Sequence, residues 1–417
     1  MYVDDDPVYK RRRLVALAVV IAVVLGLCAL GRVLLGGDDA EPAAAATPVA
    51  AAAPAKKATT VEQAAPPLRP QEEQGEPAGT ADTELVRVQR ITGGLTPKSV
   101  VASGQGLVLA QNMMYSHTVT AYRPDGARVA TVSDTVDLSD FGVKGHPGRS
   151  KGAPVEVAFS PDGRTAWVSQ YSMYGKGFAP EGADSCTSGA GISNSYLYEL
   201  DTSTFEVRRV VEVGAVPKYV AVTPDGRSVL VSNWCSMDLT VVDAAKATVT
   251  RTIPTGGQHP RGIAVSPDST TAYVAIMGSD RTVAVDLAKG SVRTLAETGD
   301  KPRHVVISPK GDYLYVTNSG AATVSKVEVS SGEVVAEAKT AADPRSTAIS
   351  PDGAALYVVE YGAARVSKIL TADMELVDSE PTDGLPIGVT YEPTTKRVWV
   401  ACYSGSIVVY DDSRRGA

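Results

Sequence analysis

The chain has 417 residues, enough for two or three average domains or for one large repeat domain. It is 44% hydrophobic and only 21% charged, so it can bury a sizeable core and is not disordered throughout. The net charge of −7 gives no indication of a nucleic-acid-binding chain, and four cysteines are too few for a small disulfide-stapled domain or an array of zinc sites. These averages conceal three different segments.

A basic cluster followed by an apolar run opens the chain. Residues 10–13 read Lys-Arg-Arg-Arg, and 18 residues without a charge follow from Leu14 to Gly31. This length predicts a membrane-spanning helix, a signal anchor, over residues 14–35. The positive-inside rule then places residues 1–13 in the cytoplasm and the rest of this single-pass cell-membrane protein outside it.

Two alternatives to an uncleaved anchor stay open. A cleaved signal peptide is compatible with the Ala-rich sequence that follows, although the apolar run is longer than an ordinary signal-peptide core. A lipoprotein is the other, because Leu25-Gly26-Leu27-Cys28 resembles a lipobox, but Leu27 stands where a small residue is required. All three interpretations place the bulk of the protein outside the cytoplasm.

Residues 36–83 are predicted to form a linker. Residues 38–82 contain 15 Ala and 7 Pro, with almost no large apolar side chain. Proline interrupts any long helix, and so little apolar surface cannot offset the entropy lost on ordering. We therefore expect a semi-extended spacer between the membrane and the next domain.

A repeat fills the remainder of the chain. Its opening prolines lie at 97, 154, 217, 260, 302, 344 and 386, and the last four intervals are 43, 42, 42 and 42 residues. Six of the seven units carry a turn of Ser-Pro-Asp-Gly type, and the copies lie at 160–163, 223–226, 266–269, 308–311 and 350–353, with a degenerate one at 392–395. Proline presets φ, aspartate accepts local hydrogen bonds and glycine tolerates positive φ, so this turn closes a hairpin.

Four short strands fit into each unit, which is typical of a β-propeller blade. In the fifth unit they are expected at Arg303–Ser308, Tyr313–Asn318, Thr323–Val329 and Glu333–Thr340. Seven units predict an all-β, seven-bladed propeller over residues 84–412, with a tail at 413–417. The last unit has three strands, so the lone strand Glu84–Thr92 is expected to complete it and close the ring. The first two units carry insertions of about 15 and 21 residues.

Tyr315-Val316-Thr317-Asn318 is the tetrapeptide after which the YVTN-repeat β-propellers are named, and looser copies recur, for example Leu230-Val231-Ser232-Asn233. The sequence from 84 to 412 resembles this family of bacterial and archaeal propellers, which is related to surface-layer propellers. The resemblance implies the fold and says little of function, because the repeated residues are mainly scaffold.

No motif for catalysis or for a cofactor stands out. The chain lacks a P-loop, a dinucleotide-binding fingerprint and an H-E-x-x-H motif, so no cofactor or metal is predicted. Some propellers of related shape are lactonases or lyases that use acidic residues or histidine at the central channel. The mouth of this channel is therefore where a site is expected.

The residue after each opening proline is expected at the channel mouth, because the innermost strand of each blade begins there. Five of the seven are cationic, namely Lys98, Lys218, Arg261, Arg303 and Arg345. The other two are Val155 and Ile387. Such a ring suits an anion, since Arg can bind carboxylate or phosphate through two hydrogen bonds. Alternatively, each cation pairs with an acid of a neighbouring loop, such as Glu156, Asp300 or Asp343.

Aromatic residues and methionines are predicted on the same face, in the loops between second and third strands. They are Met113, Met114, Tyr115, Tyr171, Tyr174, Trp234, Tyr361 and Tyr403. Exposed aromatics beside cations suit recognition of a glycan, a peptide or a protein, and the alternative is packing between loops. The insertion of the second unit, about Ser172–Ile192, belongs to this face and is a candidate lid or partner-specific loop.

The cysteines divide into three groups. Cys186 and Cys235 lie in equivalent loops of adjacent blades, and the expected location is oxidising, so we expect a disulfide between them. Cys402 ends a strand and is expected to be a buried free thiol, whereas Cys28 falls in the predicted membrane segment.

The leading hypothesis is a membrane-anchored, extracytoplasmic propeller that acts as a non-catalytic binding module for an anionic envelope ligand or a protein partner. The candidate ligand-binding residues are Lys98, Lys218, Arg261, Arg303, His304, Arg345, Tyr171, Trp234, Tyr361 and Tyr403. A second hypothesis is a lactonase-like hydrolase or lyase that uses His304, Glu156 and the arginines. A third is a structural component of the cell envelope, as the surface-layer resemblance implies.

Overall fold

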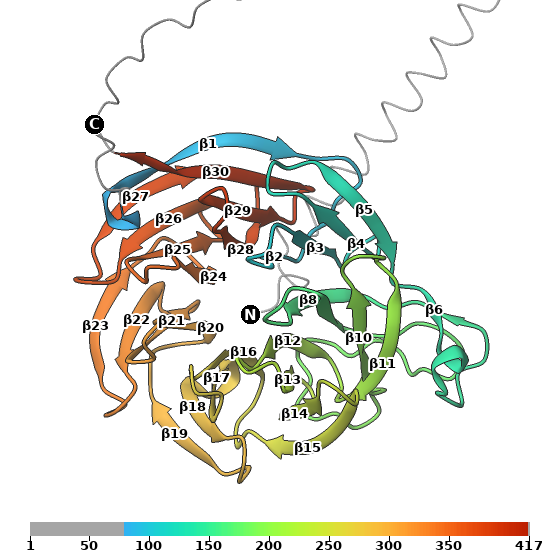
Figure 1. Ribbon diagram of the computed structural model, residues 1–417. Helices are drawn as coiled ribbons and strands as arrows, with labels where there is room; N and C mark the ends of the chain where they lie inside the picture. The colour runs from blue at the N-terminus through green and yellow to red at the C-terminus, as the bar shows by residue number, and fades with distance from the viewer. Residues whose placement is uncertain (1–78, 416–417) are drawn as a thin grey trace, which may run out of the picture. The chain divides into compact units, whose positions relative to one another are not determined.

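The structure is a computed structural model that describes residues 79–415. These residues form a ring of seven four-stranded sheets, the blades of a β-propeller, around a central axis (Figure 1). The predicted all-β, seven-bladed fold is therefore confirmed. The predicted cytoplasmic tip, the membrane segment and nearly all of the linker lie outside the described residues. Within 79–415, no helix combines the length and the apolar character needed to cross a membrane.

Each blade runs from an inner strand at the channel to an outer strand at the rim. Blade 1 consists of β2 (Ser99–Ala102), β3 (Val108–Asn112), β4 (Thr118–Tyr122) and β5 (Arg128–Ser133). Blade 2 consists of β8 (Pro154–Phe159), β9 (Thr165–Gln170), β10 (Ser195–Asp201) and β11 (Val207–Val213). Blade 3 consists of β12 (Pro217–Val222), β13 (Ser228–Asn233), β14 (Asp238–Asp243) and β15 (Thr248–Pro254).

The later blades follow the same order. Blade 4 consists of β16 (Pro260–Val265), β17 (Thr271–Ile276), β18 (Arg281–Asp286) and β19 (Val292–Ala296). Blade 5 consists of β20 (Pro302–Ile307), β21 (Tyr313–Asn318), β22 (Thr323–Glu328) and β23 (Val334–Lys339), within one residue of the predicted strands. Blade 6 consists of β24 (Pro344–Ile349), β25 (Ala355–Glu360), β26 (Arg365–Leu370) and β27 (Leu376–Pro381).

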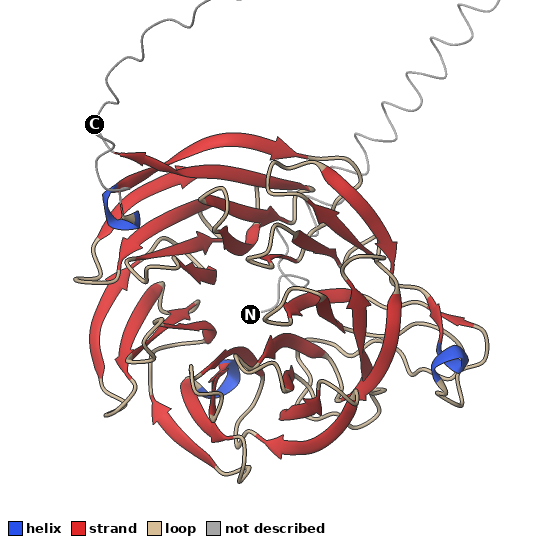
Figure 2. Ribbon diagram, in the orientation of Figure 1, coloured by secondary structure: helices blue, strands red, loops and turns tan. Residues whose placement is uncertain are grey.

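Blade 7 is assembled from both ends of the described chain. It consists of β28 (Pro386–Glu392), β29 (Arg397–Cys402), β30 (Ser406–Arg415) and β1 (Thr83–Ile91). Strand β1 pairs antiparallel with β30, so the predicted ring closure is confirmed. Figure 2 shows how little helix accompanies the strands, and the helical turns are η1 (Thr80–Asp82), η2 (Leu138–Phe141) and η3 (Met277–Ser279).

Burial explains why the repeat contains continuous apolar runs. In β21, the second strand of blade 5, Leu314, Tyr315 and Val316 are all buried, because neighbouring blades cover both faces of the sheet. The rim strand β5 shows the opposite pattern and is largely exposed. Strands that are covered on both faces need Val, Leu and Ile at successive positions rather than at alternate ones.

The Ser-Pro-Asp-Gly turns have the local hydrogen bonds and the positive φ at glycine that the sequence predicts. The Asp162 carboxylate accepts hydrogen bonds from the Ser160 hydroxyl at 2.6 Å and from the Arg164 backbone N–H at 3.1 Å. Gly163 has a positive φ of 69°, which glycine adopts without strain. These turns lie at the end of each inner strand that is remote from the mouth. Their aspartates are therefore structural.

A buried ion pair fastens the closing strand. Lys368 on β26 donates to the Thr83 carbonyl and hydroxyl oxygens at 2.7 and 2.8 Å and to the Asp412 carboxylate at 2.6 Å. The backbone N–H and the hydroxyl of Thr80 both donate to Asp352. The residues just ahead of β1 are therefore part of the propeller, whereas the sequence predicts that the linker extends to residue 83.

The two insertions lie beside each other. The insertion of blade 1 contains η2 and a two-stranded ribbon of β6 (Val136–Asp137) and β7 (Arg149–Ser150). Its His146 ring stacks on Phe178 of the blade 2 insertion, with 3.8 Å between ring centroids. The two long loops therefore support each other at one side of the ring (Figure 1).

Candidate functional site

A backbone irregularity at the start of the inner strands decides where the residue after each opening proline points. In blades 2 to 7 the register shifts just after the proline, as between Pro302 and His304. Such a bulge interrupts the alternation of a strand and re-aims one side chain. The residue before the proline adopts positive φ in blades 3 to 7, for example 55° at Lys301. The chain therefore turns sharply at the mouth.

The same turn holds the loop between the second and third strands. The backbone N–H of Tyr361 donates to the Asp343 carbonyl, and that of Tyr403 to the Leu385 carbonyl, both at 3.0 Å. Trp234 makes the equivalent bond, at 2.9 Å, to the residue before Pro217. The predicted aromatics and the predicted cations thus share one end of the ring. The sequence repeat identifies the aromatic residues and the cations, but it does not reveal the hydrogen bonds that hold them together.

The five predicted cations come together at this mouth, and we call them the mouth cluster: Lys98, Lys218, Arg261, Arg303 and Arg345. Four are buried, with 7% exposure for Lys98, 5% for Lys218 and 8% each for Arg261 and Arg303. Their positive charges act on one another. Burial, followed by repulsion from Arg261 and Arg303, lowers the pKa of Lys98 well below its usual value.

Two members of the mouth cluster have carboxylate partners. Lys218 lies 2.6 Å from Asp184, and Arg345 lies 2.7 Å from Asp343. Burial opposes ionisation of Asp184, but Lys218 outweighs it and holds the pKa of this carboxyl below its usual range. The Asp343 partner was among the acids suggested by the sequence. Asp184 was not, because it belongs to the blade 2 insertion, whose path the repeat does not set.

The other suggested acids leave the remaining cations without a close partner. Asp300 pairs with its neighbour Lys301 at 3.8 Å instead of with the ring. Glu156 acts electrostatically on Lys98, yet no ion pair joins these two within 4 Å in residues 79–415. Burial raises the pKa of Glu156, and attraction to Lys98 opposes this.

Arg261 and Arg303 form no ion pair within the described part of the chain. The Arg303 Nε is buried without a hydrogen-bond partner, and its Nη1 only approaches the Met277 sulfur at 3.9 Å. Burial and then repulsion by Arg261 and Arg345 lower the pKa of Arg303 well below its usual value. A buried guanidinium without an acceptor carries an uncompensated desolvation penalty.

Two of the predicted binding aromatics are buried and pack against Lys218 of the mouth cluster. Tyr171 and Trp234 are each 6% exposed, so the expectation that they are exposed is wrong. Their rings contact the Lys218 ammonium, 4.3 and 5.1 Å from the two centroids. The blade 2 insertion covers them: the Tyr171 hydroxyl donates to the Asp184 carboxylate at 2.8 Å.

Tyr361 and Tyr403 stay close to the arginines. The Arg345 guanidinium lies 3.6 Å from the centre of the Tyr361 ring. Burial raises the pKa of Tyr403, while Arg261, Arg303 and Arg345 oppose this rise, so its phenol interacts electrostatically with all three guanidiniums. Among the other loop residues, Tyr115 is 83% exposed.

Met114 is also exposed, whereas Met113 packs against a buried cluster that includes Tyr171 and Trp234. The Tyr174 hydroxyl donates to Glu181 within the blade 2 insertion at 2.9 Å.

His304 is half-buried, and both of its ring nitrogens have partners. Its Nε2 donates to the Tyr219 hydroxyl at 2.9 Å, and its Nδ1 accepts from the Thr347 backbone N–H at 3.4 Å. Gly262, in the intervening blade, has no side chain, and a Cβ there would lie 2.8 Å from the His304 Cα. Burial, then the charges of the mouth cluster, lower the pKa of His304 to about 3. A neutral histidine with both nitrogens occupied is a poor general base.

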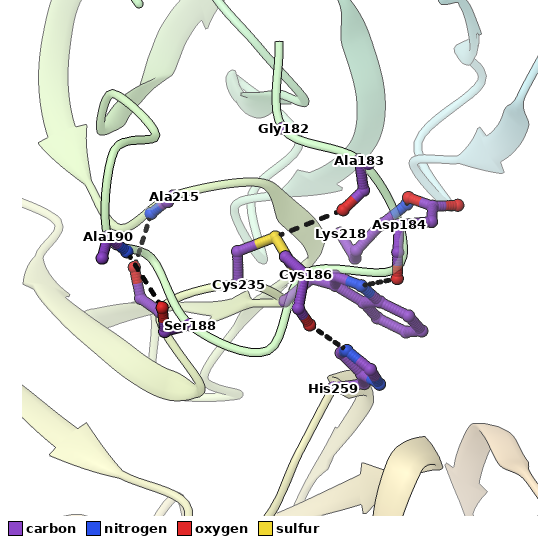
Figure 3. The surroundings of a disulfide bond; sticks show 12 residues. Gly182, Ala183, Asp184, Cys186, Ser188, Ala190, Ala215, Lys218, Cys235 and His259 are labelled. Atoms are coloured by element: carbon purple, nitrogen blue, oxygen red, sulfur yellow. Dashed lines mark hydrogen bonds and ion pairs between the residues drawn. A yellow bond between two sulfur atoms is a disulfide. The ribbon is translucent and has the colours of Figure 1, made fainter.

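A disulfide fixes the blade 2 insertion over one side of the mouth (Figure 3). Cys186 and Cys235 are bonded, with their Cα atoms 5.7 Å apart. The Cys186 carbonyl accepts from His259 Nε2 at 2.8 Å, and the indole N–H of Trp234 donates to the Asp184 carbonyl at 2.9 Å. The disulfide therefore holds Asp184 where it meets Lys218.

Cys402 is a free thiol and is completely buried, as the sequence predicts. Burial raises its pKa to about 12, so the thiolate is not populated near neutral pH. Within residues 79–415, no group of three or more His, Cys, Asp or Glu side chains has the geometry of a metal site.

Comparison with known proteins supports the architecture. Residues 254–412, which run from the end of blade 3 into β30 of blade 7, match the family model described as YNCE-like beta-propeller. The chain is similar to that family over these blades. No curated protein sequence matches the chain.

A solved structure named Kuenenia stuttgartiensis Hydrazine Synthase has a TM-score of 0.60 and 20% sequence identity, over 80% of this chain and 99% of that chain. At this identity the likeness shows the fold alone. Matching chains of solved structures number 1754, so the fold by itself does not select a function.

Proposed function

We propose that the chain is a non-catalytic binding module whose mouth cluster recognises an anionic ligand of the cell envelope. The observation that carries this proposal is the pair Arg261 and Arg303, each 8% exposed and without a carboxylate partner in the described residues. Burying a charge without a partner costs several kcal/mol in principle. An incoming anion supplies the missing partner, and Arg matches the planar or tetrahedral oxygens of carboxylate and phosphate.

The location belongs to the same proposal. Residues 14–35 anchor the chain in the cell membrane, with residues 1–13 in the cytoplasm and the propeller outside. The apolar run and its flanking basic cluster support this arrangement. The Cys186–Cys235 disulfide supports it too, because disulfides persist in oxidising compartments.

Membrane fractionation tests the anchor. The full-length chain should stay with membranes after carbonate washing, a variant without residues 14–35 should not, and added protease should reach the propeller in intact spheroplasts. N-terminal sequencing of the mature chain separates the anchor from a cleaved signal peptide. A chain that is soluble, or protected from external protease, overturns the proposed location.

Calorimetric titration of the full-length chain tests anion binding. The panel is sulfate, phosphate, acetate and nitrate at constant ionic strength. At least one anion should bind the wild type and bind Arg261→Gln at least tenfold more weakly. Arg227→Gln is the matched control, because it removes the same charge from an exposed turn at the far end of the ring (86% exposed side chain).

Three outcomes overturn the proposal. One is a panel without any binding, or binding that Arg261→Gln leaves unchanged. The second is turnover of a lactone that His304→Ala abolishes, because a non-catalytic module has no such activity. The third is capture of a protein partner equally well by the wild type and by a variant in which all five cations of the mouth cluster are replaced by Gln, because recognition then lies elsewhere.

A further inference from the structure

The positive charges at the mouth outnumber the negative ones. The cations are the five members of the mouth cluster. The carboxyl groups that act most strongly on them are Glu156, Asp184 and Asp343. Five cations and three carboxyls leave a formal excess of two positive charges. While one proton is shared between Lys98 and Glu156, the pair carries no net charge whether this proton lies on the amine or on the carboxyl, so both arrangements leave the same excess.

The excess is localised on two residues. Asp184 neutralises Lys218, and Asp343 neutralises Arg345, by direct contacts of 2.6 and 2.7 Å. Lys98 has Glu156 as its acidic neighbour. Lys98 forms no ion pair in the described residues either. Arg261 and Arg303 differ from it because the carboxyls that act on them, Asp184, Glu156 and Asp343, are those of the other three cations.

These two arginines are neighbours in the ring. They follow the opening prolines of blades 4 and 5, and the inner strands β16 and β20 of these blades lie side by side (Figure 1). Each repels the other, as the effect of Arg261 on Arg303 shows. The contact between β16 and β20 brings both arginines to the same part of the mouth, and the unpartnered Arg303 Nε shows that a donor remains unused.

Tyr403 adds a neutral donor to the same place. Its phenol interacts electrostatically with Arg261, Arg303 and Arg345, and its hydroxyl forms no hydrogen bond within residues 79–415. Its pKa is raised by burial, so it stays protonated and can donate to an anion. Arg345 contacts Asp343 and the Tyr361 ring, and because Asp343 neutralises it, Arg345 adds no net charge to the site.

Resting on the anion-binding function proposed above, we infer that Arg261, Arg303 and Tyr403 form a site for one compact dianion of the phosphate-monoester or inorganic-phosphate type. Two guanidiniums offer two charges and several N–H donors, which one tetrahedral dianion with three free oxygens can satisfy together. A monocarboxylate has one charge and two oxygens and leaves one buried guanidinium unpaired. A phosphodiester also has only one charge.

Methyl phosphate and dimethyl phosphate are the probes that separate these classes. They are close in shape, but at pH 7.5 the monoester is mostly a dianion, since the second pKa of such phosphates is about 6, and the diester is a monoanion. Titration of the full-length chain should show methyl phosphate binding at least tenfold more tightly than dimethyl phosphate. Inorganic phosphate, as a third arm, shows whether the site prefers the free ion or accepts the ester of a larger molecule.

The double variant Arg261→Gln/Arg303→Gln should bind methyl phosphate at least a hundredfold more weakly. The control Arg164→Gln/Arg227→Gln removes two charges from exposed turns (88% and 86% exposed side chains) and should bind it as the wild type does. Tyr403→Phe should weaken binding about threefold to tenfold, as expected for one hydrogen bond. Circular dichroism and a melting curve verify that each variant folds.

If the double glutamine variant does not fold, Arg261→Lys/Arg303→Lys replaces it. This variant keeps the two charges and should retain the preference for the dianion at lower affinity, because Lys lacks the planar fork of Arg. Loss of the preference in this folded variant contradicts the charge argument.

The outcomes distinguish the two proposals. Equal binding of both methyl esters, lost in the double variant, overturns the dianion inference and leaves the anion-binding function intact. Absence of binding by all three phosphates, together with binding of a panel anion that Arg261→Gln weakens, also overturns the inference alone. Binding that the double variant keeps overturns both, because the site then lies elsewhere.

Discussion

Two regions of this propeller bury positive charge, and they do so in opposite ways. At the seam of the ring, Lys368 is completely buried, and its three ammonium protons are matched by Thr83, through two oxygens, and by Asp412. At the mouth, Arg303 is also buried, but its Nε has no acceptor and it has no carboxylate partner in the described residues. The first charge fastens two ends of the chain. The second is left unsatisfied by the protein.

This difference separates a structural charge from a candidate binding charge. A buried ion pair contributes little net stability but is costly to break, since removal of one partner leaves the other charge buried alone. A buried cation that already lacks a partner destabilises the protein until a ligand supplies one. Completeness of pairing, rather than burial, is therefore the feature that marks the mouth as a site.

The same substitution should act with opposite sign in the two regions, and the larger effect is expected at the seam. Lys368→Met leaves the Asp412 carboxylate buried without its partner and loosens the anchor of β1. The free energy of unfolding should fall by about 3–5 kcal/mol. Chemical denaturation of the full-length chain measures this. A loss below about 1 kcal/mol would show that the seam does not depend on this pair.

At the mouth, Arg303→Met should raise the free energy of unfolding by about 1–3 kcal/mol in phosphate-free buffer, because it removes an unpaired, desolvated charge and its repulsion by Arg261. Arg227→Met, on an exposed turn, is the control and should change it by less than about 0.5 kcal/mol. The gain should disappear in saturating methyl phosphate, which stabilises only the wild type by mass action. A destabilised Arg303→Met variant in both buffers would make Arg303 structural, like Lys368.

The smallest expected effect is a pH dependence of anion affinity. Burial lowers the pKa of Lys218 to about 8, against the opposing effect of Asp184. The groups that face it are Asp184, Arg261, Arg303, Lys98 and the rings of Tyr171 and Trp234. Sulfate keeps one charge state across this range, so its affinity should be constant from pH 6 to 7 and fall a few-fold as the pH rises through 8.

The pH dependence of folding stability has the opposite sign to that of anion affinity. A lysine with a lowered pKa binds fewer protons folded than unfolded, so its own contribution to stability rises with pH above 8. His304, with a pKa of about 3 in the folded protein, stays neutral from pH 5 to 7 and adds no dependence to sulfate affinity there. Its contribution to folding stability rises with pH between about 3 and 6.5, because only the unfolded imidazole takes up a proton in this range. Lys218→Met should abolish the fall in sulfate affinity above pH 7. A fall that persists in Lys218→Met would assign the titration to another group.

The repeat alone determined the architecture and the position of the cations. Its period, its Ser-Pro-Asp-Gly turns and the lone strand at the start predict seven blades and their closure, because strand length, turn chemistry and alternation act within a unit of about 42 residues. The sequence also places one cation after each of five opening prolines, and it suggests the pairing of Cys186 with Cys235. These features depend on neighbours along the chain or on equivalent places in adjacent blades.

Only the tertiary structure decided which of these cations are satisfied. Lys218 contacts Asp184, which is 34 residues away in the sequence. His304 contacts Tyr219, which is 85 residues away, and Gly262 in the blade between them leaves the space for this contact. The same insertion that supplies Asp184 buries Tyr171 and Trp234. Such contacts depend on the path of a non-repeating loop and on distances between blades, neither of which a repeat period specifies. Arg261 and Arg303 were therefore two cations among five in the sequence, and they became a candidate site only when the folded ring left them without partners.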